Sequence, residues 1–154
     1  MLTLPASDWF IALASAYPGA VTVAQPHDWR VAVRDVRVRC GTPTNCAGVA
    51  GALVDFEPAR EFRFEARLAT GITDEDSDSV QLWVAAFEKG VRSELINVGG
   101  GTLPPVRLIL RWILDHPIDS NEAFNVLAGR MGVAEAIRRA SAAEGPPTKS
   151  RGEF

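Results

Sequence analysis

Apolar and polar residues alternate along residues 29–39 and 61–71, which is the pattern of β-strands with one buried face. In the first stretch, "WRVAVRDVRVR", the apolar residues change phase at Arg34-Asp35. Such a change predicts one extra residue in the strand, a β-bulge. In the second stretch, "EFRFEARLATG", the alternation is uninterrupted. We therefore predict two strands here, the first of them bulged.

Two further strands are predicted by shorter apolar runs. Residues 49–58, "VAGALVDFEP", follow a loop rich in Gly, Pro and Asn, and residues 106–115, "VRLILRWILD", follow a second glycine-rich loop. In the latter run, strict alternation puts Trp112 on the same face as Leu108 and Leu110. The sequence thus predicts that Trp112 faces the core.

After the acidic segment 73–78, "TDEDSD", the apolar period becomes that of a helix. The apolar positions of this predicted helix are Val80, Trp83, Val84, Phe87, Val91 and Leu95. Glu88 and Arg92 lie one turn apart on its outer face and are expected to pair. Negative charge is favourable at a helix N-terminus, so the acidic segment indicates a solvated cap rather than an ion site.

A second long helix is predicted after residue 118. Asp119 is a candidate N-cap, with Glu122 three residues later as in a capping box. The predicted buried positions are Phe124, Leu127, Met131, Ala134 and Ile137. The Gly-Pro-Pro at residues 145–147 should end the helix.

The order strands, helix, strand, helix predicts an α+β two-layer sandwich, because both helices need the same apolar sheet face as partner. We expect three regions along the chain. Residues 1–28 form an N-terminal extension with a short helix that begins near Ser7, residues 29–144 form the folded domain, and residues 145–154 form a flexible C-terminal tail.

Composition and charge narrow the classes of function. A chain of 154 residues, 47% of them apolar, can bury one core, and its net charge of −3 provides no general attraction to nucleic acid. No run is long enough to span a membrane, and no Lys or Arg precedes Arg30, which argues against a signal peptide. We expect a cytoplasmic protein that binds no membrane.

The candidates for chemistry are few. Cys40 and Cys46 fit no standard zinc spacing, even with His27 as a third ligand, so free thiols are expected and no metal site. Asp119 and Ser120 are more simply explained as capping residues than as parts of a hydrolase. The phosphate-binding motif G-x-x-x-x-G-K-[ST] is missing, and the glycines of "NVGGGTLPP" follow a helix rather than a strand. We therefore predict no nucleotide, no cofactor and no enzymatic activity.

Several short motifs in the second half of the chain occur in the order and spacing of a known family. They are Glu88-Lys89-Gly90-Val91-Arg92, Pro105-Val106, His116 at a turn, Asp119-Ser120, Glu122-Ala123-Phe124 and Glu135-Ala136. Over residues 60–140 the chain resembles domain IV of translation elongation factor G, which is also found in tetracycline ribosomal-protection proteins. Over residues 29–58 the resemblance is positional only.

This resemblance implies a mixed four-stranded sheet with two helices on one face, a left-handed β-α-β crossover, and the superfold shared with ribosomal proteins. In the family, two loops form a tip that enters the decoding region of the small ribosomal subunit. The matching tip residues here, which we take as candidate RNA- or partner-binding residues, are His116, Asp115, Pro117, Thr42, Thr44 and Asn45.

The chain also departs from the family pattern. The loop "CGTPTNCAG" contains no Arg or Lys, although the corresponding family loop is basic, and there is no GTPase motif. Two hypotheses therefore remain open. In the first, the chain is a GTPase-less module that binds the small ribosomal subunit or structured RNA. In the second, it is a protein-interaction module on the same fold, and a homodimer through the uncovered sheet face belongs to this second class.

Overall fold

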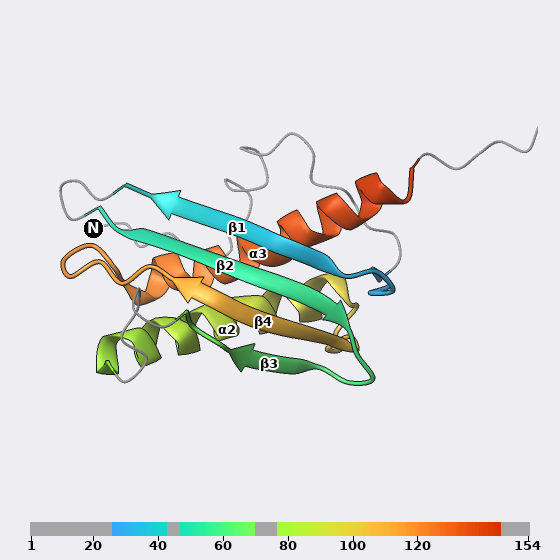
Figure 1. The fold of residues 1–154 in the computed structure, drawn as a ribbon, viewed down its shortest axis with the longest axis horizontal. Coiled ribbons are helices and arrows are strands. Elements are labelled where there is room, and N and C mark those ends of the chain that lie inside the picture. The colour runs from blue at the N-terminus through green and yellow to red at the C-terminus, as the bar shows by residue number, and fades with distance from the viewer. Residues whose placement is uncertain (1–25, 43–46, 70–76, 146–154) are drawn as a thin grey trace, which may run out of the picture.

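The structure is a computed structural model, and it describes residues 26–42, 47–69 and 77–145 (Figure 1). The predicted helix near Ser7 and the tail beyond Gly145 lie outside the described residues. The elements are β1 (Val33–Gly41), β2 (Val49–Pro58), β3 (Arg63–Ala66), α2 (Asp78–Val98), β4 (Val106–Ile113) and α3 (Glu122–Ala143).

The four strands form one mixed sheet in the order β1-β2-β4-β3. The β1–β2 and β2–β4 pairs are antiparallel, and β3 pairs with β4 in parallel. Both helices lie behind the sheet in Figure 1, which leaves the face toward the viewer uncovered by helices. The predicted α+β fold with two helices on one face is confirmed.

The connection from β3 through α2 to β4 is left-handed. In Figure 1, β3 and β4 both point to the left, β4 lies above β3, and α2 lies behind them. A right-handed crossover would need α2 in front of the sheet in this view. Left-handed crossovers are rare among parallel strand pairs, so this feature restricts the fold strongly.

The bulge predicted in β1 is present. The register of β1 against β2 shifts between Val33 and Val36, and Asp35 adopts a φ of 54°. The backbone N–H of Asp35 donates to the buried carboxylate of Asp55 at 2.7 Å. This hydrogen bond stabilises a left-handed backbone that a non-glycine residue rarely adopts.

The core lies between the sheet and the two helices. The β2 side chains that face it are Ala50, Ala52, Val54 and Phe56, all fully buried. At the end of the sheet where β2 finishes, the buried Trp29 stacks on Phe56 with ring centroids 5.2 Å apart. The predicted apolar face of α2 is confirmed, since Val80, Phe87, Val91 and Leu95 are buried there.

Two glycines let the helices approach closely. A Cβ at Gly90 of α2 would lie 2.0 Å from the carbonyl oxygen of Val126. A Cβ at Gly129 of α3 would lie 2.2 Å from the carbonyl oxygen of Phe87. Backbone atoms cannot give way by such amounts, so only glycine fits at either position.

The buried face predicted for α3 is only partly correct. Ala134 is exposed, and the buried residues are Asn125, Ala128, Gly129, Gly132, Val133, Ala136 and Ala140. Because α3 packs against both the sheet and α2, its buried face consists mainly of small residues. Phe124, Met131 and Ile137 pack at the margin of the core. The predicted N-cap is wrong, since Asn121 rather than Asp119 accepts from the backbone N–H of Phe124.

The predicted orientation of Trp112 is wrong as well. The register of β2 against β4 shifts so that Val54 pairs with Leu110, and the next pair is Leu53 with Trp112. Arg111 is therefore the extra residue of a bulge. Beyond it, Ile113 takes the core-facing position and is 1% exposed. Trp112 is consequently on the uncovered face, opposite Leu53.

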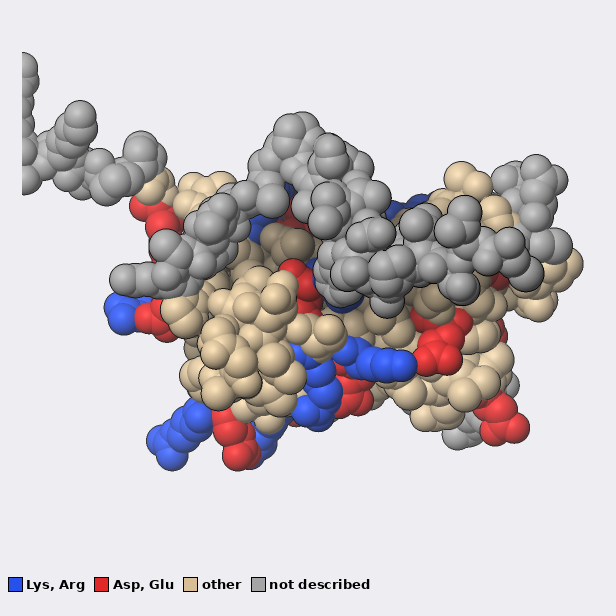
Figure 2. All heavy atoms as spheres, turned by 180° about the vertical axis from the view of Figure 1, so that it is seen from behind, with Lys and Arg blue, Asp and Glu red and all other residues tan. Residues whose placement is uncertain are grey.

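Acidic and basic side chains are interspersed on the helix side of the molecule (Figure 2), and several of them form ion pairs. Glu88 pairs with Arg92 at 2.8 Å, as predicted, and Lys89 pairs with Glu122 at 3.2 Å. Among the helices that the structure describes, none is both long and apolar enough to cross a membrane.

Candidate functional site

The turn between β4 and α3 is closed by the side chain of His116. Its Nδ1 accepts from the backbone N–H of Asp119 at 3.1 Å and of Ile118 at 3.4 Å. Its own backbone N–H donates to Ser120 Oγ at 2.8 Å. Since Nδ1 is an acceptor, the neutral ring carries its proton on Nε2. His116 therefore stabilises the turn with one edge and leaves Nε2 as a donor.

The same turn is attached to two other elements. Asp115 accepts from Trp83 Nε1 at 2.8 Å and from Ser79 Oγ at 3.0 Å, both from the first turns of α2. The backbone N–H of Val49, where β2 begins, donates to the carbonyl of Asp119 at 3.0 Å. The sequence predicted Asp115 as a contact residue, but its carboxylate is hydrogen-bonded to α2 and attaches the turn to that helix.

The β1–β2 loop begins and ends at two glycines with positive φ, Gly41 at 75° and Gly48 at 100°. A Cβ at Gly41 would lie 2.0 Å from the carbonyl oxygen of Gly48, so the two loop ends are in close contact. Thr42 is described and exposed, whereas Thr44 and Asn45 lie outside the described residues. The described end of this loop lies beside the His116 turn, since Val49 forms a β-bridge with Ser120.

We call the described residues of these two segments, 41–42, 47–48 and 114–121, the tip. They contain no Lys or Arg, and their carboxylates are those of Asp115 and Asp119. Asp119 is 6% exposed, with Oδ2 3.4 Å from His116 Nδ1 and Oδ1 unpaired among the described residues. Ile118 is 72% exposed. The tip therefore offers one imidazole donor, neutral polar groups, the carboxylate of Asp115, and the exposed apolar side chains of Pro117 and Ile118.

The uncovered face of the sheet carries charged side chains from all four strands. Arg111 of the β4 bulge pairs with Asp35 at 2.7 Å and with the buried Asp55 at 3.2 Å. A hydrogen bond to Asp35 and attraction by Asp55 raise the pKa of Arg111. A hydrogen bond from Arg107 lowers the pKa of Glu65 on β3. One sequence signal was the adjacent Arg111-Trp112 pair, which follows the apolar run Leu108-Ile109-Leu110.

The described residues gather no cluster of metal ligands, and the thiol and the hydroxyl that the sequence offered are hydrogen-bonded within the fold. No group of three or more His, Cys, Asp or Glu side chains in ranges 26–42, 47–69 and 77–145 is arranged to hold a metal ion. Cys40 is a free thiol that donates to the carbonyl of Phe124 at 3.4 Å, and burial raises the pKa of this thiol. Ser120 is hydrogen-bonded within its own turn. Cys46 lies outside the described residues.

Comparison with protein families found no match, and comparison with curated proteins found no similar sequence. Among solved structures, the fold is similar to part of the crystal structure of a protein from Thermus thermophilus, with a TM-score of 0.53 and 19% sequence identity. The similarity covers 68% of this chain and 15% of that protein. At this identity it shows a shared fold alone. This chain thus has an α+β fold that also occurs as a small part of a much longer protein.

Proposed function

We propose that this chain is a non-catalytic, GTPase-less module of the elongation factor G domain IV type, which binds the small ribosomal subunit or structured RNA through its tip. The motifs of residues 60–140 support this assignment. The left-handed crossover through α2 supports it as well, because that feature is expected for the family and is rare elsewhere (Figure 1).

The observation that carries the proposal is the bracing of the His116 turn. Hydrogen bonds fix it internally through His116 and Ser120, and Asp115 attaches it to α2. A loop that is already ordered loses little entropy when it binds a partner. Binding residues on rigid scaffolds concentrate in such loops.

The chemistry of the tip sets the kind of contact. His116 Nε2 can donate to a phosphate or a base, and the exposed side chain of Ile118 can lie against a base or a sugar. Few phosphates are neutralised by such a surface, so affinity should be modest and should depend weakly on salt.

The test is co-sedimentation of the full chain with small ribosomal subunits at low and moderate salt. The informative substitution is His116→Asn, since asparagine Oδ1 takes the place of Nδ1 in the turn but nothing replaces Nε2. We expect this variant to bind more weakly by about 1 kcal/mol. Arg60→Gln, at the opposite end of the sheet, is the control and should bind as wild type. Equal pelleting of the wild type and His116→Asn would contradict the proposal.

The exposure of Ile118 favours a second candidate function, protein interaction through the same tip. An apolar side chain that is 72% exposed on a braced loop can be buried by a protein partner, and binding residues concentrate in such loops. In that case Ile118→Ser should abolish binding of a protein partner, and ribosomal subunits should not pellet the wild-type chain at either salt concentration.

A further inference from the structure

Over part of the uncovered sheet face, the charged side chains are paired so that their charges cancel. Ion pairs between 2.7 and 3.9 Å link eight of its side chains into one network: Asp35, Arg111, Asp55, Arg34, Glu57, Arg107, Glu65 and Arg67. Four carboxylates and four guanidinium groups cancel in charge. This network lies over the middle of the sheet and the end remote from the tip.

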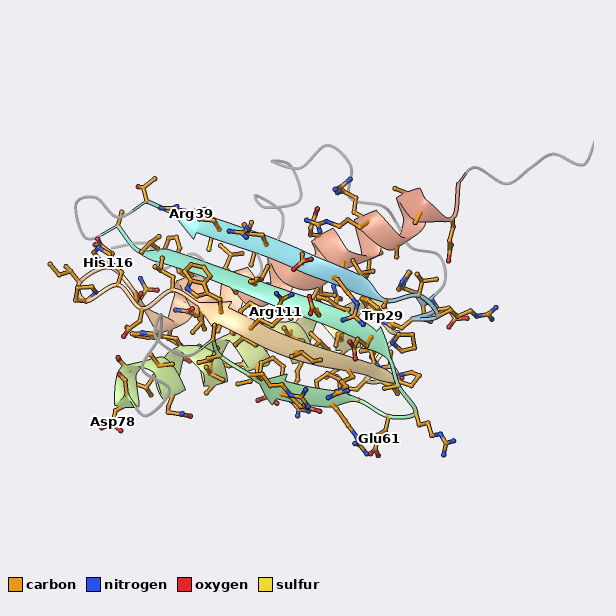
Figure 3. All side chains as sticks on the ribbon, viewed as in Figure 1. Trp29, Arg39, Glu61, Asp78, Arg111 and His116 are labelled. Atoms are coloured by element: carbon orange, nitrogen blue, oxygen red, sulfur yellow. The ribbon has the colours of Figure 1, made fainter. Side chains whose placement is uncertain are left out.

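Two arginines of β1 lie outside this network. Arg37 and Arg39 are exposed, and neither side chain has an ion pair or hydrogen bond partner among the residues that the structure describes. Their alternation with the buried Val36 and Val38 puts both on the uncovered face. The excess positive charge of this face is therefore located at its tip-proximal end, where Figure 3 places Arg39.

Trp112 lies in the same part of the sheet. The register aligns Arg37 with Leu53, and Leu53 with Trp112, in one row across three strands. A Cβ at Gly51 would lie 3.2 Å from Trp112 Cζ3 and 3.4 Å from Cη2, so the indole extends over Gly51. Gly51 is in turn the register partner of Arg39. The two unpaired arginines thus flank the half-buried indole on its β1 side.

This row borders an open hollow of about 360 Å³. Its lining residues are Arg37, Leu53, Arg67, Ala69, Arg111 and Trp112. Figure 3 shows Arg111, a member of the neutral network, near the centre of the sheet. The hollow therefore joins an aromatic ring, apolar side chains and three arginines, of which Arg37 lies outside the neutral network.

We propose that this row binds a short segment of single-stranded RNA, with a base stacked on Trp112 and the backbone phosphates paired with Arg37 and Arg39. Single-strand binding surfaces combine an aromatic platform with cations that follow the backbone. An acidic peptide would pair with the arginines but would leave the indole unused. The choice of RNA over DNA rests on the proposed function, whereas the surface itself is independent of the tip.

The binding test is fluorescence anisotropy of a labelled oligouridine of roughly ten nucleotides, titrated with the full chain. Trp112→Leu should weaken binding roughly tenfold, and Trp112→Phe should retain most of it, because an aromatic ring is kept. Arg37→Gln and Arg39→Gln should each weaken binding and reduce the salt slope by about 0.7. Arg60→Gln, an exposed arginine also without a described partner, should change neither quantity.

Thermal melting identifies any variant that does not fold. If Trp112→Leu does not fold, Trp112→Phe and the two arginine variants still test whether this surface binds RNA. Absence of wild-type binding at micromolar concentration would overturn the proposal. An equal loss in Arg60→Gln would also overturn it. Binding of a polyglutamate peptide that is insensitive to Trp112 substitution, without RNA binding, would assign the surface to an acidic protein instead.

Two further measurements distinguish RNA from DNA as the ligand, and the sheet face from the tip as the binding surface. An oligodeoxythymidine of the same length should bind more weakly than the RNA, and equal binding would overturn the choice of RNA. His116→Asn should leave oligouridine binding unchanged even where it weakens ribosome pelleting. The proposal for the tip and the proposal for the sheet face can therefore be contradicted independently of each other.

Discussion

The side chain of His116 closes the turn that carries it. The sequence predicted the position of this residue between a strand and a helix, but the acceptor role of Nδ1 depends on a turn conformation that the sequence did not reveal. A substitution at this position therefore changes turn stability as well as any contact with a partner.

We predict that His116→Ala lowers the free energy of unfolding by about 1 kcal/mol, because the backbone N–H groups of Asp119 and Ile118 lose their acceptor. His116→Asn should lose clearly less, since its side-chain oxygen can accept in place of Nδ1. Urea unfolding of both variants measures the difference. Equal stability of the two variants would mean that the Nδ1 hydrogen bonds contribute nothing.

Trp112 shows why part of the candidate site was missed at the residue scale. Strict alternation through residues 106–115 assigned this side chain to the core. The bulge at Arg111 reverses the assignment, and no Gly, Pro or Asn marks it in the sequence. The cause is tertiary: Arg111 pairs with Asp55 and Asp35, which come from two other strands.

At the scale of elements, the close approach of α2 and α3 depends on glycine. We predict that Gly90→Ala lowers the free energy of unfolding by roughly 2 kcal/mol or more, because its Cβ would meet the Val126 carbonyl oxygen at 2.0 Å. Gly132→Ala is the matched control on α3. Its Cβ would be in ordinary contact, 3.7 Å from Phe87 and Val54.

Alanine at residue 132 should therefore stabilise the chain by roughly 0.5–1 kcal/mol, since it removes backbone freedom from the unfolded state. Chemical denaturation of the two variants should give changes of opposite sign. A destabilised Gly132→Ala variant together with an unchanged Gly90→Ala variant would contradict the packing of the two helices.

The same packing explains which part of the helix prediction failed. The period of α2 was correct because the large residues predicted for its buried face, such as Phe87, Val91 and Leu95, point into the core. Leu82 and Ile96 of the same helix are exposed. In α3 the large residues Phe124, Met131 and Ile137 lie at the margin, while the centre of contact holds Ala and Gly. Hydrophobicity alone does not distinguish a buried alanine from an exposed one, such as Ala134.

Glu135 of α3 makes stability depend on acid pH. Hydrogen bonds from Arg138 and Arg139 lower its pKa from 4.5 to about 2. A carboxylate with a lowered folded-state pKa stabilises the fold fully above pH 4.5 and loses this contribution as the pH falls toward about 2. We predict that the melting temperature of wild type falls more steeply across this window than that of Glu135→Gln. Parallel curves would show that the pair contributes no pH-dependent stability.

At the scale of the whole molecule, the order of elements and the common face of the helices were predictable from period changes alone. The handedness of the crossover was not, because general rules favour the opposite hand and only the family resemblance indicated this one. The distribution of charge also required the structure. The net charge of −3 does not reveal that the described charges of the uncovered sheet face cancel except for those of Arg37 and Arg39.

This distribution leads to a prediction about the length of RNA that the chain can bind. The unpaired cations occupy one end of the sheet face, the network beside them is neutral, and the rest of a chain with net charge −3 repels phosphate. Affinity for oligouridine should therefore rise up to about four nucleotides and then level off, after correction for the number of binding registers. Anisotropy titrations with a series of lengths measure this directly. A continued rise in affinity with length would require a longer basic path than Arg37, Arg39 and the hollow provide, and the RNA would then have to continue along residues outside this row.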